Sequence, residues 1–147
     1  MKTFEELKED LLERAKKHHA CQDGYSMGLN AKSKQDLLKA ITDNWYWVLS
    51  ASKMIDANYL EKNFTEEELT EAGIYTRKEH TSNAKSFACG SATVEAYGSA
   101  TVKAYDNSYV EDCTKNINTV SDHGIVKDYY NHKIYIKKGK FEIIEIE

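Results

Sequence analysis

The sequence predicts an α+β protein in which an N-terminal helical cap is followed by a small β-solenoid. Two patterns predict this fold class. Apolar residues recur at three- and four-residue steps in the first half, as they do in amphipathic helices. The second half instead carries an eight-residue repeat rich in Ala, Thr, Val and Tyr. We therefore expect a helical region at residues 1–81 and a β-solenoid of about eight octapeptide units at residues 82–147.

Capping boxes indicate where the first and last helices of the helical region begin. A threonine followed three positions later by a glutamate occurs at Thr3 and Glu6 and again at Thr65 and Glu68, and each pair can satisfy two free amides of a first helical turn. The first helix should extend through Ala15 to a basic end, and the last should stop near Gly73.

The sequence between these two helices predicts a loop, then a helix with a clear apolar pattern (the strong helix), and then a helix with a weaker pattern. The loop includes Asp23 and Gly24, and the strong helix begins at Ser33. A weaker helical pattern covers residues 54–64. The apolar stripe of the strong helix consists of Leu37, Leu38, Ile41, Trp45, Val48 and Leu49.

The octapeptide repeat is clearest at residues 91–98 and 99–106, which read SATVEAYG and SATVKAYD. Because an even period preserves the alternation of side chains along a strand, each column of the repeat keeps its face. The predicted inward columns are Ala84, Ala92, Ala100 and Ser108, then Ser86, Val94, Val102 and Val110, then Ala88, Ala96 and Ala104. The predicted outward residues are Thr93, Glu95, Thr101, Lys103, Tyr109 and Glu111. The predicted turn position, where left-handed backbone is tolerated, holds Gly90, Gly98, Asp106 and Asp122.

Stacking of these units into coils buries their apolar face. Two octads per coil give a thin, two-sided coil of about 16 residues, which we prefer to a triangular coil of about 24 because Ala and Val suit a narrow interior. The competing fold is a repetitive β-meander, since Gly98 and Ser99 could form a hairpin turn. An alternating final strand at 141–147, preceded by Lys137, Lys138 and Lys140, could blunt the sheet edge or form a homodimer there.

Composition and charge exclude several classes of function. The net charge of −4 disfavours direct nucleic-acid binding, and it is too mild to indicate mimicry of DNA. The sequence has no apolar run of membrane-spanning length and no signal peptide, so we expect a cytoplasmic protein without a membrane partner. Three cysteines without metal-type spacing, and no nucleotide-binding motif, predict no metal and no cofactor.

Two groups of aromatic residues are candidate protein-binding surfaces. Cys89, Tyr97, Tyr105, Cys113 and Tyr129 occupy one outward repeat position, which predicts a ridge whose contact residues are Tyr97, Tyr105, Tyr109 and Tyr129. The alternative is that stacked tyrosines only stabilise the solenoid. The second candidate is a patch on the cap made of Trp45, Tyr46 and Trp47, which could equally be core contacts.

The sequence carries no recognisable catalytic constellation, and we expect a protein that is not an enzyme. An enzyme or small-ligand sponge, with a site between cap and solenoid, remains an alternative. Its obvious catalytic candidates are His80, Cys89 and His123.

The segments 19–24 and 31–40, together with the Ala-Thr-Val-x-Ala-Tyr repeats, resemble uncharacterised small proteins of phages and mobile elements from gut bacteria. Such proteins join a helical N-terminal region to a repetitive β tail. The resemblance implies an anti-CRISPR-like inhibitor that binds a host protein, such as a CRISPR effector or another defence component. A structural module that assembles through solenoid edges is the alternative.

Overall fold

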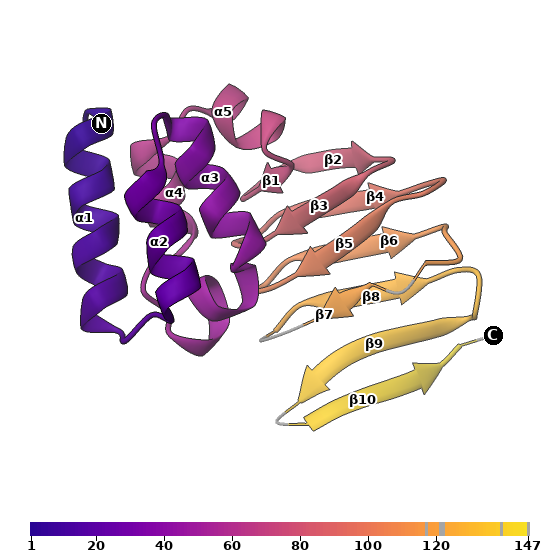
Figure 1. Cartoon of the computed structure of the whole chain (residues 1–147). Coiled ribbons are helices and arrows are strands. Elements are labelled where there is room, and N and C mark those ends of the chain that lie inside the picture. The colour runs from indigo at the N-terminus through magenta and orange to yellow at the C-terminus, as the bar shows by residue number, and fades with distance from the viewer. Residues whose placement is uncertain (117, 121–122, 139, 147) are drawn as a thin grey trace. The chain divides into compact units, whose positions relative to one another are not determined.

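The computed structural model describes residues 1–116, 118–120, 123–138 and 140–146, and its contacts divide the chain into two compact units (Figure 1). The helical unit is Met1–Ala72 and the solenoid unit is Gly73–Glu147. The predicted fold class, a helical region followed by a β-solenoid, is confirmed. The contacts place the division before Gly73 and not after residue 81, because two early strands lie ahead of the recognisable repeat.

Both predicted capping boxes begin helices. Thr3 caps α1 (Phe4–Lys17) and Thr65 caps α5 (Glu66–Glu71). In each case the threonine hydroxyl accepts a hydrogen bond from the third helical amide, while the glutamate accepts from the threonine amide at 2.8 Å. The left-handed φ of +73° at Gly73 lies two positions beyond the last residue of α5, as the sequence predicted.

The predicted loop around Asp23 and Gly24 is wrong, because these residues lie in α2 (Gln22–Asn30). Cys21 caps this helix through its Sγ, which accepts a hydrogen bond from the Gly24 amide at 3.4 Å. The sequence concealed the helix because glycine is a poor helix former and because α2 has no apolar stripe. None of its residues is buried.

The predicted helix from Ser33 to Leu49 is interrupted rather than continuous. Ser33 caps α3 (Lys34–Asp43), and the backbone then widens into the π-helix η1 (Trp47–Ala51). All six residues of the predicted apolar stripe are nevertheless buried. The weaker prediction at 54–64 corresponds to α4 (Ala57–Asn63), which Asp56 caps.

Asp10 joins the start of the chain to α4 through three donors. Its carboxylate accepts hydrogen bonds from the Arg14 Nε at 3.1 Å and from the Tyr59 hydroxyl, and it pairs with the Lys2 Nζ at 2.8 Å. Burial raises the pKa of the Asp10 carboxyl, but the bonds from Lys2, Tyr59 and Arg14 outweigh it, so the pKa lies below its usual value. Burial and the Asp10 charge raise the pKa of Tyr59.

Asp10→Asn is expected to lower the free energy of unfolding by about 1–2 kcal/mol at pH 7, because charged hydrogen bonds are lost. A carboxyl whose folded-state pKa is depressed stabilises the protein above its unfolded-state pKa of about 4, and this contribution is lost as the pH falls through the folded-state pKa. Urea unfolding of the two proteins should therefore differ at pH 7, and the difference should shrink as the pH falls below about 4. Asp43→Asn is the control, since its exposed pair with Lys39 should contribute less than about 0.5 kcal/mol.

The described residues of the solenoid unit form ten strands in two sheets. The four-stranded sheet has the order β1-β3-β5-β7, and the six-stranded sheet has the order β10-β9-β8-β6-β4-β2. The strands are β1 (Ile74–Tyr75), β2 (Glu79–Ser82), β3 (Lys85–Ala88), β4 (Thr93–Ala96), β5 (Thr101–Ala104), β6 (Tyr109–Asp112), β7 (Thr119–Val120), β8 (Ile125–Asp128), β9 (Lys133–Lys138) and β10 (Lys140–Glu145).

Consecutive octads alternate between the two sheets, so one coil contains two octads. Thr93 pairs with Tyr109 in the six-stranded sheet, and Lys85 pairs with Thr101 in the four-stranded sheet, an offset of 16 residues in both cases. The preferred two-octad coil is therefore the observed one. The alternative β-meander is wrong for β1 to β8, because every pair among these strands is parallel.

The interior between the two sheets is narrow and built from small residues. Its core consists of Ala88, Ala92, Val94, Ala96, Ala100, Val102, Ala104, Val110, Val120 and Val126. Of the predicted inward residues only Ala84 is exposed, and it lies in the bend between β2 and β3. The inward column that begins at Ala96 continues as Asp112 and then Asp128, whose buried carboxylates accept amide hydrogen bonds from Thr114 at 2.8 Å and from Asn131 at 2.9 Å.

The predicted turn position has the expected backbone. Gly90, Gly98 and Asp106 all have φ between +55° and +59°. The Asp106 carboxylate accepts a hydrogen bond from the Gly90 amide at 3.0 Å, which ties equivalent turns of neighbouring coils together. Asp122, the fourth predicted member, lies outside the described residues.

The repeat ends earlier than its predicted extension toward residue 145. After β8 the chain forms β9 and β10, which pair antiparallel with β8 and with each other. Ile134 and Ile136 replace the Ala and Val of the earlier octads, and Tyr135 packs on the core. The final strand lies at the sheet edge as predicted, but the side chains of Lys137, Lys138 and Lys140 lie outside the described part of the structure.

Candidate binding surface

The outer surface of the six-stranded sheet presents two columns of side chains in register. One column contains Thr93, Tyr109 and Ile125, and the other contains Glu95, Glu111 and Lys127. Parallel pairing at every step holds successive members of a column on neighbouring strands. The spacing of these side chains is therefore set by strand pairing and not by the conformation of a loop.

Two tyrosines extend this surface at the ends of β4 and β8. Tyr97 is 44% exposed and Tyr129 is 42% exposed. Cys113 occupies the equivalent position after β6, and it is also exposed. The Cys113 amide donates to the Ala96 carbonyl and the Tyr129 amide to the Asp112 carbonyl, both at 2.9 Å, so these positions stack with the coils.

Hydrogen bonds connect these tyrosines to the glutamate column. The Tyr97 hydroxyl donates to the Glu95 carboxylate at 3.3 Å. The Tyr109 and Tyr129 hydroxyls both donate to Oε1 of Glu111 at 3.2 Å. We name this cluster, consisting of Glu95, Tyr97, Tyr109, Glu111, Lys127 and Tyr129, the Tyr/Glu face.

The surroundings of two phenols in the Tyr/Glu face, Tyr97 and Tyr109, raise their pKa. The neighbouring Glu95 charge raises the pKa of the Tyr97 hydroxyl, and burial followed by the Glu111 charge raises that of Tyr109. The Lys127 Nζ lies 4.6 Å from the centre of the Tyr129 ring, and a hydrogen bond with Tyr129 raises the lysine pKa. The surface thus combines phenol hydroxyls with two carboxylates and one cation, which suits recognition of another polar surface.

The structure does not place Tyr105 with the other residues of the predicted tyrosine ridge. Tyr105 is 1% exposed and follows β5 of the four-stranded sheet, whereas Tyr97 and Tyr129 follow strands of the six-stranded sheet. Cys89, which follows β3, is likewise buried. Positions eight residues apart lie on opposite sides of a two-octad coil, so the predicted single ladder divides into two.

The predicted cap patch of Trp45, Tyr46 and Trp47 does not form one exposed surface. Trp45 is 1% exposed, Tyr46 is 54% exposed, and Trp47 is half-buried against an apolar cavity. Consecutive helical residues point about 100° apart, so three neighbours cannot share a face. Tyr46 alone remains as an exposed candidate.

The three catalytic candidates occupy different environments. The His80 ring stacks on Tyr75 with centroids 4.1 Å apart, and its Nε2 lies 2.7 Å from the Arg77 carbonyl. Cys89 is buried and His123 is exposed. Cys113 is an exposed residue, but its thiol is partly desolvated and has three carboxylates nearby. Desolvation, followed by the charges of Asp112, Glu111 and Glu95, raises the pKa of the thiol, which keeps the sulfur in its less nucleophilic form.

Sequence reasoning missed the part played by Glu111 and Lys127 in this surface. Glu111 was placed outward but was not recognised as the acceptor shared by two tyrosines. The signal was present, since Tyr109 and Glu111 stand two positions apart and therefore share a face. The link from Glu111 to Tyr129 spans one coil, and it follows only from the 16-residue register.

Among the described residues, no group of three or more His, Cys, Asp or Glu side chains is arranged to hold a metal ion. Within the same part of the chain, no helix is both long and apolar enough to cross a membrane. Comparisons with protein-family models, with curated proteins and with solved structures found no significant match to the chain. The fold and the surface define the chain as a helical protein with a β-solenoid that carries an exposed aromatic and acidic face.

Proposed function

We propose that this chain is a non-enzymatic protein-binding protein that engages its partner through the Tyr/Glu face. The observation that carries the proposal is the exposure of Tyr97 and Tyr129 directly after strands β4 and β8, where backbone hydrogen bonds to the preceding coil hold them in the stack. Tyrosine gives a large contact area with few rotatable bonds, and it is enriched among residues that dominate binding energy. Preorganisation by the parallel ladder lowers the entropy lost on binding.

The charges of the face indicate the chemistry of the partner surface. Glu95 and Glu111 stand in adjacent positions of one column, with Lys127 as the third member. A partner that presents arginine or lysine could pair with the two carboxylates and lie over the tyrosine rings. We therefore propose a protein partner with a basic patch.

The biological role that we propose is inhibition of a host defence protein, such as a CRISPR effector, in the cytosol of the host cell. The resemblance to small proteins of phages and mobile elements supports this role. A basic patch that contacts nucleic acid would be an accessible target for an acidic and aromatic surface, because it is already exposed and positively charged.

To test the Tyr/Glu face, the tagged full-length chain is used to capture a partner from host lysate, and the captured protein is identified. Calorimetry then measures the affinity of the chain for the purified partner. Tyr97→Ala combined with Tyr129→Ala should weaken binding by at least about 30-fold, since hot-spot tyrosines contribute roughly 2 kcal/mol. Glu95→Lys should slow association and reduce its dependence on salt. Expression of the chain should protect phage in cells that contain the partner, and the double variant should lose this effect.

Tyr46→Ala is the matched control, because it removes an equally exposed tyrosine from the helical unit. It should leave affinity and phage protection unchanged. The proposal is wrong if Tyr46→Ala abolishes binding while the double variant binds normally. Retention of binding by both variants, together with dimers in light scattering, would instead favour assembly through the edge strand β10.

A further inference from the structure

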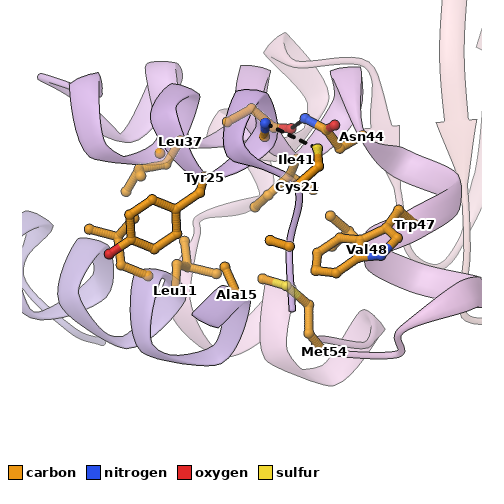
Figure 2. A pocket seen from close by; sticks show the side chains of 15 residues that line it. Leu11, Ala15, Cys21, Tyr25, Leu37, Ile41, Asn44, Trp47, Val48 and Met54 are labelled. Atoms are coloured by element: carbon orange, nitrogen blue, oxygen red, sulfur yellow. Dashed lines mark hydrogen bonds between the residues drawn. The ribbon is translucent and has the colours of Figure 1, made fainter. Parts of the chain in front are cut away.

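The helical unit contains an apolar cavity of about 200 Å³ that no part of the proposed protein-binding surface uses (Figure 2). Leu11 and Ala15 of α1 line one side, and Ile41 of α3 lines another. Tyr25 of α2, Trp47 of η1 and Met54 complete the apolar wall. All the lining residues belong to Met1–Ala72, so the cavity is a property of this unit alone.

Two glycines of α2 leave room for the cavity. Gly24 and Gly28 stand four positions apart, so they share one face of the helix, and both line the cavity. A Cβ added at Gly28 would lie 3.3 Å from the Leu12 Cδ2, and one added at Gly24 would lie 3.4 Å from the Cys21 Sγ. These glycines leave room beside the α2 backbone, and the Tyr25 side chain of the same helix forms part of the wall.

The lining selects for an uncharged aromatic ligand. Figure 2 shows the Tyr25 ring and the Trp47 indole on opposite sides of the space, with the Met54 thioether near Trp47. Rings and thioethers make favourable contacts with aromatic ligands. Because no lining residue is charged, a charged ligand would lose its hydration without compensation.

Asn44 supplies a polar group to this apolar lining. Its Nδ2 donates to the Ala40 carbonyl at 2.9 Å, which orients the carboxamide. Its Oδ1 lies 3.4 Å from the position of a Cβ added at Gly24, and so it stands at the wall where the glycine leaves room. This oxygen can accept a hydrogen bond from an N–H or O–H of a bound molecule.

We propose that the helical unit binds a small, uncharged aromatic molecule that carries one N–H or O–H donor in this cavity. Apolar cavities of about 150 Å³ are known to stay dry and to bind benzene. The space here is slightly larger and partly open to solvent, so it fits a substituted single ring or two fused rings. Phenols and indoles are the simplest members of this class, and Asn44 is the predicted acceptor for their donor group.

Calorimetric titration of the full-length chain with phenol, toluene, indole and benzoate tests the proposal. Phenol and indole should bind saturably at one site, toluene should bind about tenfold more weakly than phenol, and benzoate should not bind. Ala40→Leu, which adds bulk at the cavity wall, should weaken indole binding at least tenfold and raise the melting temperature. Ala51→Leu makes the same change at an exposed position outside the cavity and should alter neither.

Gly28→Ala serves as a second, smaller filling variant if Ala40→Leu fails to fold. It should reduce indole affinity while adding helix propensity to α2. The proposal is overturned if neither phenol nor indole gives saturable binding up to its solubility limit. It is equally overturned if the filled variants bind indole as tightly as the original chain.

Discussion

Val94→Lys should unfold the solenoid unit. Val94 is fully buried in the narrow interior, and its neighbours across the coils are His80 and Val110. A lysine there would either bury an unpaired ammonium group or displace the strand to reach water. We expect a loss of more than about 4 kcal/mol, which approaches the whole stability of a small domain. Far-UV circular dichroism during urea unfolding measures the loss.

Glu95→Lys is the matched control for Val94→Lys, because it introduces the same side chain at the next position of β4. Glu95 is exposed on the opposite face of the strand, and its hydrogen bond to Tyr97 is a surface contact. The unfolding free energy should change by no more than about 0.5 kcal/mol. Equal midpoints for the two lysine variants would contradict the assignment of inward and outward residues along β4.

Trp45→Ala should produce the largest loss of stability among single truncations in the helical unit. Trp45 is the largest fully buried side chain of the molecule as described. Truncating a buried tryptophan removes its apolar contacts and leaves a cavity, which typically costs about 3–5 kcal/mol. The loss should appear as a lower urea midpoint and a lower melting temperature.

Tyr46→Ala, one residue further along the same helical segment, tests whether the effect of Trp45→Ala follows from burial. Tyr46 is mostly exposed, so its truncation should shift the free energy of unfolding by no more than about 0.5 kcal/mol. A penalty at Tyr46 as large as that at Trp45 would show that the aromatic run acts as one packed group.

The parity of the repeat made the solenoid interior predictable from the sequence. Strand side chains alternate with a period of two, and a period of eight preserves that alternation, so columns such as Val94, Val102 and Val110 were assigned correctly. Left-handed turns at Gly98 and Asp106 followed from the tolerance of glycine and aspartate for positive φ. Local chemistry was sufficient in both cases.

The sequence did not show which octad joins which sheet, and this assignment determines which tyrosines are exposed at the candidate site. Tyr97 and Tyr105 have nearly the same sequence neighbours, yet one is exposed and the other is buried. Local pattern cannot distinguish them, because the difference depends on which sheet each octad joins. The glycine-containing helix α2 was missed for another reason, since its Cys21 cap is an uncommon one and its glycines oppose helix propensity.

The two-octad coil also limits how a gene for such a protein can change length. Copying a single octad would transfer every later strand to the opposite sheet, and a tyrosine such as Tyr97 would exchange its surroundings for those of Tyr105. Copying a segment of 16 residues, the offset between paired strands, would instead add one complete coil and leave all other pairings intact. Duplication in units of a whole coil is therefore the genetic route by which this scaffold can lengthen while its binding surface is retained.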